Sequence, residues 1–239
     1  MSHADEVLSL PGWPSSEPLP SRQFSGYIPV HKSLWHYHLT EAESEPKTAP
    51  LVLYVSGGPG GSSFRAGFQG FGQLLLDQRS LDDRLPATNF PRLFRNPLAW
   101  STAANVLAWE CPPGVGFSFC PDGSDRLGWT DEKTAVHSAD FLAGVVDRHP
   151  HLHGRHFFVF GASYAGIYIP MLAEEILKRG PTYPLELVGI GCGNSVVGHF
   201  PNASGLPASH DLVRRSSFQI LSLHNACSQS TIATWSPRF

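Results

Sequence analysis

The sequence predicts an α/β protein built on a mostly parallel sheet with helices on both faces. Three observations support this prediction. Several short, continuous apolar runs have the pattern of strands that are buried on both faces. These runs are residues 51–55, 105–109, 157–160 and 187–192. Segments with apolar residues at helical spacing, near 131–147 and from 169 onward, alternate with the last of these strands. Turn residues such as glycine follow three of the runs, so the loops after them are expected to gather at one edge of the sheet.

Taken in order, the elements begin with residues 1–23, which are rich in proline and serine and are expected to be an extended lead-in. Alternating residues over 26–39 predict two strands with a turn near 31–33. A polar connector over 41–50 leads into the first buried strand. Thr130 is the expected N-cap of the helix over 131–147, and Pro150 ends it.

Length and composition fit one folded unit. The 239 residues are 41% hydrophobic and 15% charged, so the chain can bury a large core, and we treat residues 1–239 as a single domain. The net charge of −3, with scattered basic residues, disfavours a nucleic-acid partner. No apolar run approaches membrane-spanning length, and the polar residues 1–6 lack the apolar core of a secretion signal. No membrane partner is therefore expected, and the oligomeric state is left open.

Cysteine and histidine predict neither a disulfide scaffold nor a metal centre. The four cysteines are dispersed, and the simplest interpretation is packed thiols, although Cys111 and Cys120 could close a small loop in an oxidising compartment. Histidines alternate over 149–156, which would place some of them on one face of an extended segment. A solvated connection is the favoured interpretation of that segment. No metal or other cofactor is predicted.

The segment with the clearest chemical signal is residues 157–166. Bulky apolar residues run directly into Gly-Ala-Ser-Tyr-Ala-Gly, and helical spacing follows. Strand, sharp turn and helix would lift the Ser163 hydroxyl above the carboxyl edge of the sheet, beside the positive end of the helix. The sequence therefore predicts Ser163 as a nucleophile, although an ordinary turn with an incidental serine has the same short pattern.

Residues 56–63, Ser-Gly-Gly-Pro-Gly-Gly-Ser-Ser, form a second glycine-bearing loop at the same predicted edge. Acyl transfer needs two N–H donors aimed at the developing oxyanion, and glycine lets the backbone come close enough to supply them. We expect these donors to be the amides of Gly58 and Tyr164. A phosphate-binding loop would need a Gly-Lys-Ser/Thr sequence that is absent here, and a plain flexible loop is the remaining alternative.

These two segments resemble motifs of the serine carboxypeptidase family. Residues 56–63 resemble the family's Asn-Gly-Gly-Pro-Gly-Cys-Ser-Ser, and residues 161–166 resemble its Gly-Glu-Ser-Tyr-Ala-Gly. Further similarity runs in the family's order along the chain. It is found at 10–12, 25–28, 96–100, 104–107, 113–118 and 193–194.

The resemblance implies an α/β-hydrolase fold and a serine-type carboxypeptidase that releases C-terminal residues through an acyl-enzyme on Ser163. Its substrate would be a peptide or protein, and a histidine oriented by a buried acid would accept the serine proton. Gly57, with Ser56 at the family's asparagine position, would bind the substrate's terminal carboxylate. Secretion or a vacuolar or lysosomal location is implied as well.

Several departures from the family pattern affect this expectation. Ser56 and Ala162 replace the asparagine and the first glutamate of the carboxylate-binding network, and Gly70 falls where its second glutamate should be. Alanine and glycine cannot donate the hydrogen bond that a protonated carboxyl can. Two alternatives therefore stay open: an inert, peptide-binding relative, and a carboxypeptidase-like acyltransferase.

The triad acid and histidine should follow Ser163 on later strands. The only later aspartate is Asp211, with His199, His210 and His224 nearby, in a Ser/Asn/Pro-rich region without a second buried run. These residues are poor triad candidates. The sequence is therefore expected to be the N-terminal portion of the family's domain, with the fold incomplete at the C-terminus.

Overall fold

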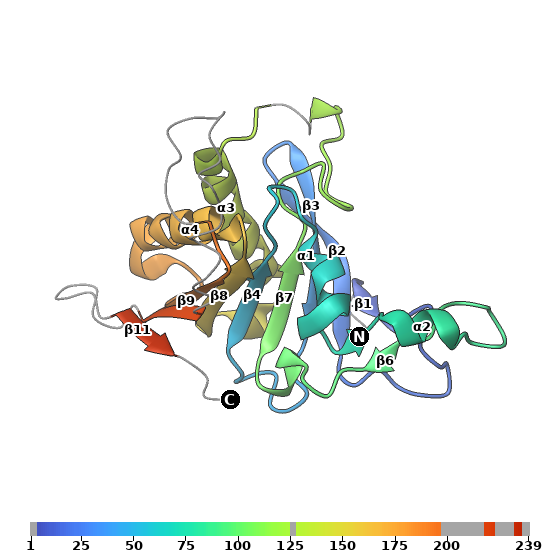
Figure 1. The fold of residues 1–239 in the computed structure, drawn as a ribbon. Helices are drawn as coiled ribbons and strands as arrows, with labels where there is room; N and C mark the ends of the chain where they lie inside the picture. The colour runs from blue at the N-terminus through green and yellow to red at the C-terminus, as the bar shows by residue number, and fades with distance from the viewer. Residues whose placement is uncertain (1–3, 125–127, 197–217, 223–231, 236–239) are drawn as a thin grey trace, which may run out of the picture.

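The computed structural model describes residues 4–124, 128–196, 218–222 and 232–235, and one large sheet organises them (Figure 1). Within these residues the sheet has nine strands in the order β1-β2-β3-β7-β4-β8-β9-β10-β11. Strands that are neighbours in space but distant in sequence, such as β7 and β4, are joined by long connections. The α/β class predicted from the sequence is confirmed.

The centre of the sheet is parallel. It consists of β7 (Asn105–Trp109), β4 (Leu51–Val55), β8 (His156–Ala162) and β9 (Glu186–Gly193). Leu53 of β4 lies opposite Leu107 of β7 on one side and Val159 of β8 on the other. All four strands were predicted from their apolar runs. Because they are parallel, the loops that follow them leave the sheet at one edge.

Antiparallel strands flank this centre. On one side lie β1 (Glu6–Val7), β2 (Gln23–Val30) and β3 (Ser33–Thr40), and on the other lie β10 (Phe218–Ser222) and β11 (Ile232–Trp235). The predicted hairpin is confirmed, and His31 takes a positive φ of 51° at its turn. The sheet is therefore mixed, with its parallel strands at the centre.

Two long helices, α3 (Asp131–Arg148) and α4 (Ala165–Arg179), lie together on one face of the sheet (Figure 1). α3 begins after the predicted N-cap Thr130, whose Oγ accepts the Lys133 N–H at 3.2 Å. The helices and the inward side chains of the strands form one buried core. Its members include Leu53, Leu142, Phe157, Val159, Ile169 and Leu172.

The opposite face of the sheet carries short elements. They are α1 (Ser63–Ala66), the π-helical turn η1 (Gly67–Phe71), the paired strands β5 (Leu74–Leu75) and β6 (Phe94–Arg95), α2 (Gln78–Asp82) and the 3₁₀ turn η2 (Trp100–Thr102). Further 3₁₀ turns, η4 (Pro150–Leu152) and η5 (Gly180–Thr182), follow α3 and α4. Phe71, Val106 and Ala108 form a second, smaller apolar cluster with Tyr54 and Trp100.

The structure describes both the Cys111 and Cys120 thiols and the histidine-bearing segment 149–156. Cys111 and Cys120 are free, buried thiols, so the possible bridge between them is not formed. The segment after α3 is not simply solvated, which corrects the sequence-based interpretation. His149 is 2% exposed, and its Nε2 lies 2.8 Å from the Tyr37 hydroxyl, because the chain turns inward at the end of the helix.

Candidate active site

Ser163 stands on the turn between β8 and α4 with a φ of 62°. An L-residue adopts this left-handed conformation only where surrounding contacts hold it, because it costs on the order of 1–2 kcal/mol. Here the Ser163 N–H donates to the Gly193 carbonyl at 3.3 Å, and the Ser163 carbonyl accepts from Gly166 at 3.1 Å and Val196 at 2.9 Å. The predicted strand, sharp turn and helix are thus present around this serine.

The glycine-rich loop after β4 lies directly against the serine turn. A Cβ added to Gly57 would come 2.6 Å from the Tyr164 nitrogen and 2.7 Å from the Ser163 Cβ. The cause is the sheet register, because Val55 at the end of β4 pairs with Gly161 at the end of β8. Segments more than 100 positions apart are thereby brought into contact at one edge of the sheet.

Hydrogen bonds within residues 56–63 fix the path of this loop. The Gly61 N–H donates to the Gly57 carbonyl at 2.7 Å, and the Ser56 N–H donates to Ser63 Oγ at 3.0 Å. The Ser56 hydroxyl donates to the Ser62 carbonyl at 3.2 Å. Gly58 has a φ of 121°, which is open to glycine and strained for other residues. The backbone amides of the loop are therefore held in place before any ligand binds.

An open cleft of about 470 Å³ adjoins this edge. It is lined by Pro59 and Gly60 of the glycine-rich loop, by the loop after β7, by the start of α3, and by Tyr164 and Tyr168. The Tyr164 hydroxyl donates to the Asp131 carboxylate at 3.0 and 3.1 Å. Burial, and then the hydrogen bond to Asp131, raise the pKa of the Tyr164 phenol, so the phenol keeps its proton. The bond to Asp131 thus fixes the side chain of Tyr164, the residue that follows Ser163.

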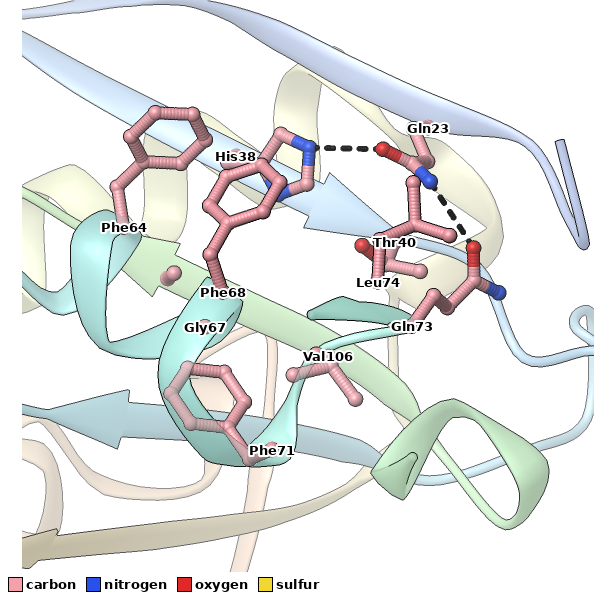
Figure 2. Close-up of a pocket in the computed structure, with 12 residues that line it drawn as sticks. Gln23, His38, Thr40, Phe64, Gly67, Phe68, Phe71, Gln73, Leu74 and Val106 are labelled. Atoms are coloured by element: carbon pink, nitrogen blue, oxygen red, sulfur yellow. Dashed lines mark hydrogen bonds between the residues drawn. The ribbon is translucent and has the colours of Figure 1, made fainter. Parts of the chain in front are cut away.

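Figure 2 shows a different cavity, which lies beneath α1 and η1. Its volume of about 30 Å³ suits roughly one water molecule. His38 Nε2 lies 3.1 Å from Gln23 Oε1, and the Gln23 amide donates to Gln73 Oε1 at 3.0 Å. Burial, followed by the nearby His36, lowers the pKa of His38 to about 4. This cavity is too small for a substrate, and Ser163 does not line it.

The possible triad partners named from the sequence lie outside the described residues. They are Asp211, His199, His210 and His224. Within the part of the chain that the structure describes, no hydrogen bond joins Ser163 Oγ to an imidazole, and no three metal-ligating side chains gather at one point. The described residues therefore bring together Ser163, the glycine-rich loop and a neighbouring cleft.

Comparison with known proteins identifies the family of this chain. Residues 11–236 match the serine carboxypeptidase family. The chain belongs to that family. Serine carboxypeptidase-like 25 of Arabidopsis thaliana is 38% identical over 210 residues, which are 84% of this chain. Serine carboxypeptidase-like 20 of the same plant is 35% identical over 216 residues, 86% of the chain. The chain spans 41% of each of these curated relatives.

A solved structure supports the fold of this serine carboxypeptidase relative. A prohormone-processing carboxypeptidase from Saccharomyces cerevisiae superposes with a TM-score of 0.66, covering 82% of this chain and 44% of that chain. The sequence identity is 22%, so the likeness concerns the fold alone. The predicted α/β-hydrolase-like fold is confirmed.

The three departures from the family's carboxylate-binding residues occupy different settings. The Ser56 hydroxyl is engaged with its own loop, and Ala162 is the last residue of β8. Gly70 lies in η1, where its carbonyl accepts from the Asn96 amide at 2.7 Å and an added Cβ would meet no atom within 4 Å. Side chains of carboxyl type are absent at both glutamate positions.

Sequence reasoning missed two acidic residues near the site. Asp131 was recognised as part of a helix start, and its contact with Tyr164 depends on how α3 meets α4. Glu110 directly follows β7 and is 1% exposed. Its signal was available in the sequence, since a charged residue directly after a fully buried strand lies at the edge where the site forms.

Proposed function

We propose that this chain supplies the nucleophile and the oxyanion-binding amides of a serine-type carboxypeptidase. The single observation that supports this proposal best is the contact between Gly57 and the turn that carries Ser163. That contact brings a strained serine against the glycine-rich loop, and Pro59, Gly60 and Tyr164 on either side of the contact line an open cleft. Such an arrangement suits the attack of a hydroxyl on a carbonyl carbon.

In this proposal Ser163 Oγ attacks the carbonyl carbon of the last peptide bond and loses its proton to a histidine. The carbonyl oxygen becomes an oxyanion, which accepts hydrogen bonds from the Gly58 and Tyr164 amides. Collapse of the tetrahedral intermediate breaks the C–N bond, and the departing amine takes the proton from the histidine. Water then hydrolyses the acyl-enzyme. The histidine and its acid would come from outside the described residues.

Recognition of the free carboxylate is the weakest part of the site. Gly57 and Ser56 would provide its remaining contacts, because positions 70 and 162 lack carboxyl groups. A lost hydrogen bond to a charged partner costs on the order of 1.5–3 kcal/mol. This observation favours a second candidate, an acyltransferase of the same family that uses Ser163 on an acyl donor without a free carboxylate. An inert peptide-binding relative is the outcome if the serine does not react.

The setting of this activity is part of the proposal. A peptide or protein would be the substrate, and the family kinship suggests secretion or a vacuolar or lysosomal compartment. Among the residues that the structure describes, no helix has the length and hydropathy needed to cross a membrane.

A fluorophosphonate probe tests the nucleophile. We expect covalent labelling of Ser163, located by peptide mass spectrometry, and complete loss of labelling in Ser163→Ala. Ser195, at the same edge but with its hydroxyl bonded to the Gly193 carbonyl, provides the matched control Ser195→Ala. Labelling that is absent from the wild-type chain, or unchanged in Ser163→Ala, would reject the catalytic proposal.

Substrate pairs with free and amidated C-termini separate the two catalytic candidates. A carboxypeptidase should favour the free carboxylate, and the variant Ser56→Asn/Gly70→Glu/Ala162→Glu should raise that preference by at least tenfold in kcat/KM. A chain that turns over ester acyl donors but neither peptide would instead support the acyltransferase.

A further inference from the structure

Glu110 is a buried carboxylate behind the glycine-rich loop that the proposed reaction leaves unexplained. Its side chain is 1% exposed at the carboxyl end of β7. The Ser62 hydroxyl donates to Glu110 Oε1, and the Phe117 N–H donates to Oε2 at 2.5 Å. Burial raises the pKa of Glu110, but bonds from His36, Ser62 and Phe117 outweigh it, so the pKa lies below its usual value. The group is therefore a carboxylate at neutral and mildly acidic pH.

The loop after β7 is shaped around this carboxylate. Gly116 has a φ of 52°, and an added Cβ there would overlap the Glu110 carboxyl group. The Ser118 hydroxyl donates to the backbone carbonyl of Glu110 at 2.6 Å and accepts a hydrogen bond from the backbone N–H of His36 at 2.7 Å. Residues 116–118 of the Pro-Gly-Val-Gly-Phe-Ser motif thus form a close-fitting enclosure for one acid.

A histidine and a serine extend the cluster across the sheet. His36 of β3 has a buried side chain, with Nδ1 3.5 Å from Glu110 Oε2 and Nε2 2.9 Å from Ser25 Oγ. The order serine, histidine, acid is that of a catalytic triad. Ser25, however, lines neither the cleft beside the glycine-rich loop nor the cavity beneath α1 and η1. His36 therefore lies between Ser25 and Glu110, with Nε2 within hydrogen-bond distance of the hydroxyl and Nδ1 close to the carboxylate.

Ser62 connects Glu110 to the proposed oxyanion site. Its Oγ also accepts the Arg65 N–H at 3.0 Å as the N-cap of α1, and its carbonyl accepts the Ser56 hydroxyl at 3.2 Å. Both ends of the glycine-rich loop are therefore tied to Ser62. A shift of Ser62 would move Gly57, which has no free space against the serine turn.

We infer that Glu110, held by the Phe117 N–H and flanked by His36, is a positioning residue that sets the oxyanion-binding amides through Ser62. The inference rests on the proposed function for its chemical meaning, since it deepens the role of the same loop. It also explains why glycine and serine occupy positions 116 and 118. Gly116 leaves room for the Glu110 carboxylate, and the Ser118 hydroxyl holds the Glu110 backbone carbonyl. Glu110 itself does not line the cleft beside Tyr164 and the glycine-rich loop.

The test compares Glu110→Gln with Glu41→Gln in the 239-residue chain. Glu41 is a matched control because its side chain is 8% exposed, it pairs with Arg22 at 3.8 Å, and it follows β3 at the opposite edge of the sheet. We expect Glu110→Gln to slow fluorophosphonate labelling of Ser163 at least tenfold and to speed hydrogen exchange at the Gly61 amide. Glu41→Gln should leave the labelling rate and the Gly61 exchange unchanged, even if it lowers the melting temperature as much as Glu110→Gln does.

A double-mutant cycle with Ser62→Ala tests the route of the effect. If Glu110 acts through Ser62, the double variant should label no more slowly than the slower single variant. Equal slowing by Glu110→Gln and Glu41→Gln, multiplicative slowing in the cycle, or unchanged exchange at Gly61 would overturn the inference. If wild-type Ser163 does not label at all, the proposed function fails for this chain. In that case the positioning role is tested only by hydrogen exchange at the Gly61 amide, compared between Glu110→Gln and Glu41→Gln.

Discussion

One methyl group added at Gly57 should disturb both the fold and the candidate site. The atoms that a Cβ would meet, the Tyr164 nitrogen and the Ala162 carbonyl oxygen, belong to the backbone and cannot rotate away. We predict that Gly57→Ala destabilises the fold by about 1–3 kcal/mol, as overpacking of a filled site does. It should also abolish labelling of Ser163. Chemical denaturation and probe labelling would measure the two effects.

Gly70→Ala is the control for this prediction, because an added Cβ there meets nothing within 4 Å. It should keep wild-type labelling and lose no stability. If Gly57→Ala were as stable and as reactive as Gly70→Ala, the close approach of the loop to the serine turn would be wrong.

The positive φ of Ser163 gives a second prediction about a single residue. Glycine reaches this conformation without the steric cost that a Cβ brings. Ser163→Gly should therefore be more stable than Ser163→Ala by about 1 kcal/mol, measured from urea midpoints. At Val136, a 40% exposed position inside α3, the same pair of substitutions should rank in the opposite order. If the Gly and Ala variants ranked in the same order of stability at both positions, backbone strain at Ser163 would be refuted.

α3 and α4, the two helices that cover the core, are tied together by Asp140. Its carboxylate lies 2.7 Å from Arg179 Nη1 and 2.9 Å from His31 Nε2, so it also connects α3 to the β2–β3 turn. Burial raises the pKa of Asp140, but the hydrogen bonds from Arg179 and His31 have the larger combined effect and lower it overall. The folded state thus prefers the ionised carboxylate.

The sign of the pH dependence follows from that lowered pKa. Stability from Asp140 is fully present above the unfolded pKa of about 3.9 and is lost as the pH falls through the lower folded pKa. We predict that Asp140→Asn costs about 1 kcal/mol at pH 7, a value kept small because the side chain is 35% exposed. The difference from wild type should shrink below pH 4.

Urea titrations at several pH values would measure this difference. Glu174→Gln is the control, since its pair with Lys178 on α4 is exposed to solvent and should contribute little to stability. A cost of Asp140→Asn that persists unchanged at pH 2 would exclude the ion pairs as its cause.

At the scale of the molecule, the described residues cover the two faces of the sheet unequally. The face opposite α3 and α4 has an open apolar hollow of about 490 Å³, lined by residues that include Leu98, Trp100 and Phe160. Leu98 is 81% exposed. We predict that the 239-residue chain binds the apolar dye ANS and self-associates, because a hollow of this kind favours contact with other apolar surfaces.

Leu98→Lys should reduce both dye fluorescence and association, as measured by fluorescence and light scattering. Leu8→Lys is the control, because Leu8 is similarly exposed, at 80%, but lies outside the hollow. Equal effects of the two substitutions would show that general surface hydropathy, and not the hollow, drives association.

The sequence predicted the central strands closely because each is a short apolar run with a turn residue at its end. The strands at 51–55 and 105–109 have the expected bounds, and α3 starts after its expected N-cap Thr130. Local signals could not reveal the burial of His149 or the contact between Asp131 and Tyr164. Both depend on how α3 packs against elements distant in sequence.

The amino-acid order alone specified the serine turn and the glycine-rich loop, since glycine spacing and apolar runs are local properties of the chain. Their contact was decided by the parallel register that sets Val55 of β4 beside Gly161 of β8. The enclosure of Glu110 by Ser62, His36 and Phe117 was likewise settled only in three dimensions. A buried carboxylate needs several donors at once, and only the folded sheet edge brings those donors together.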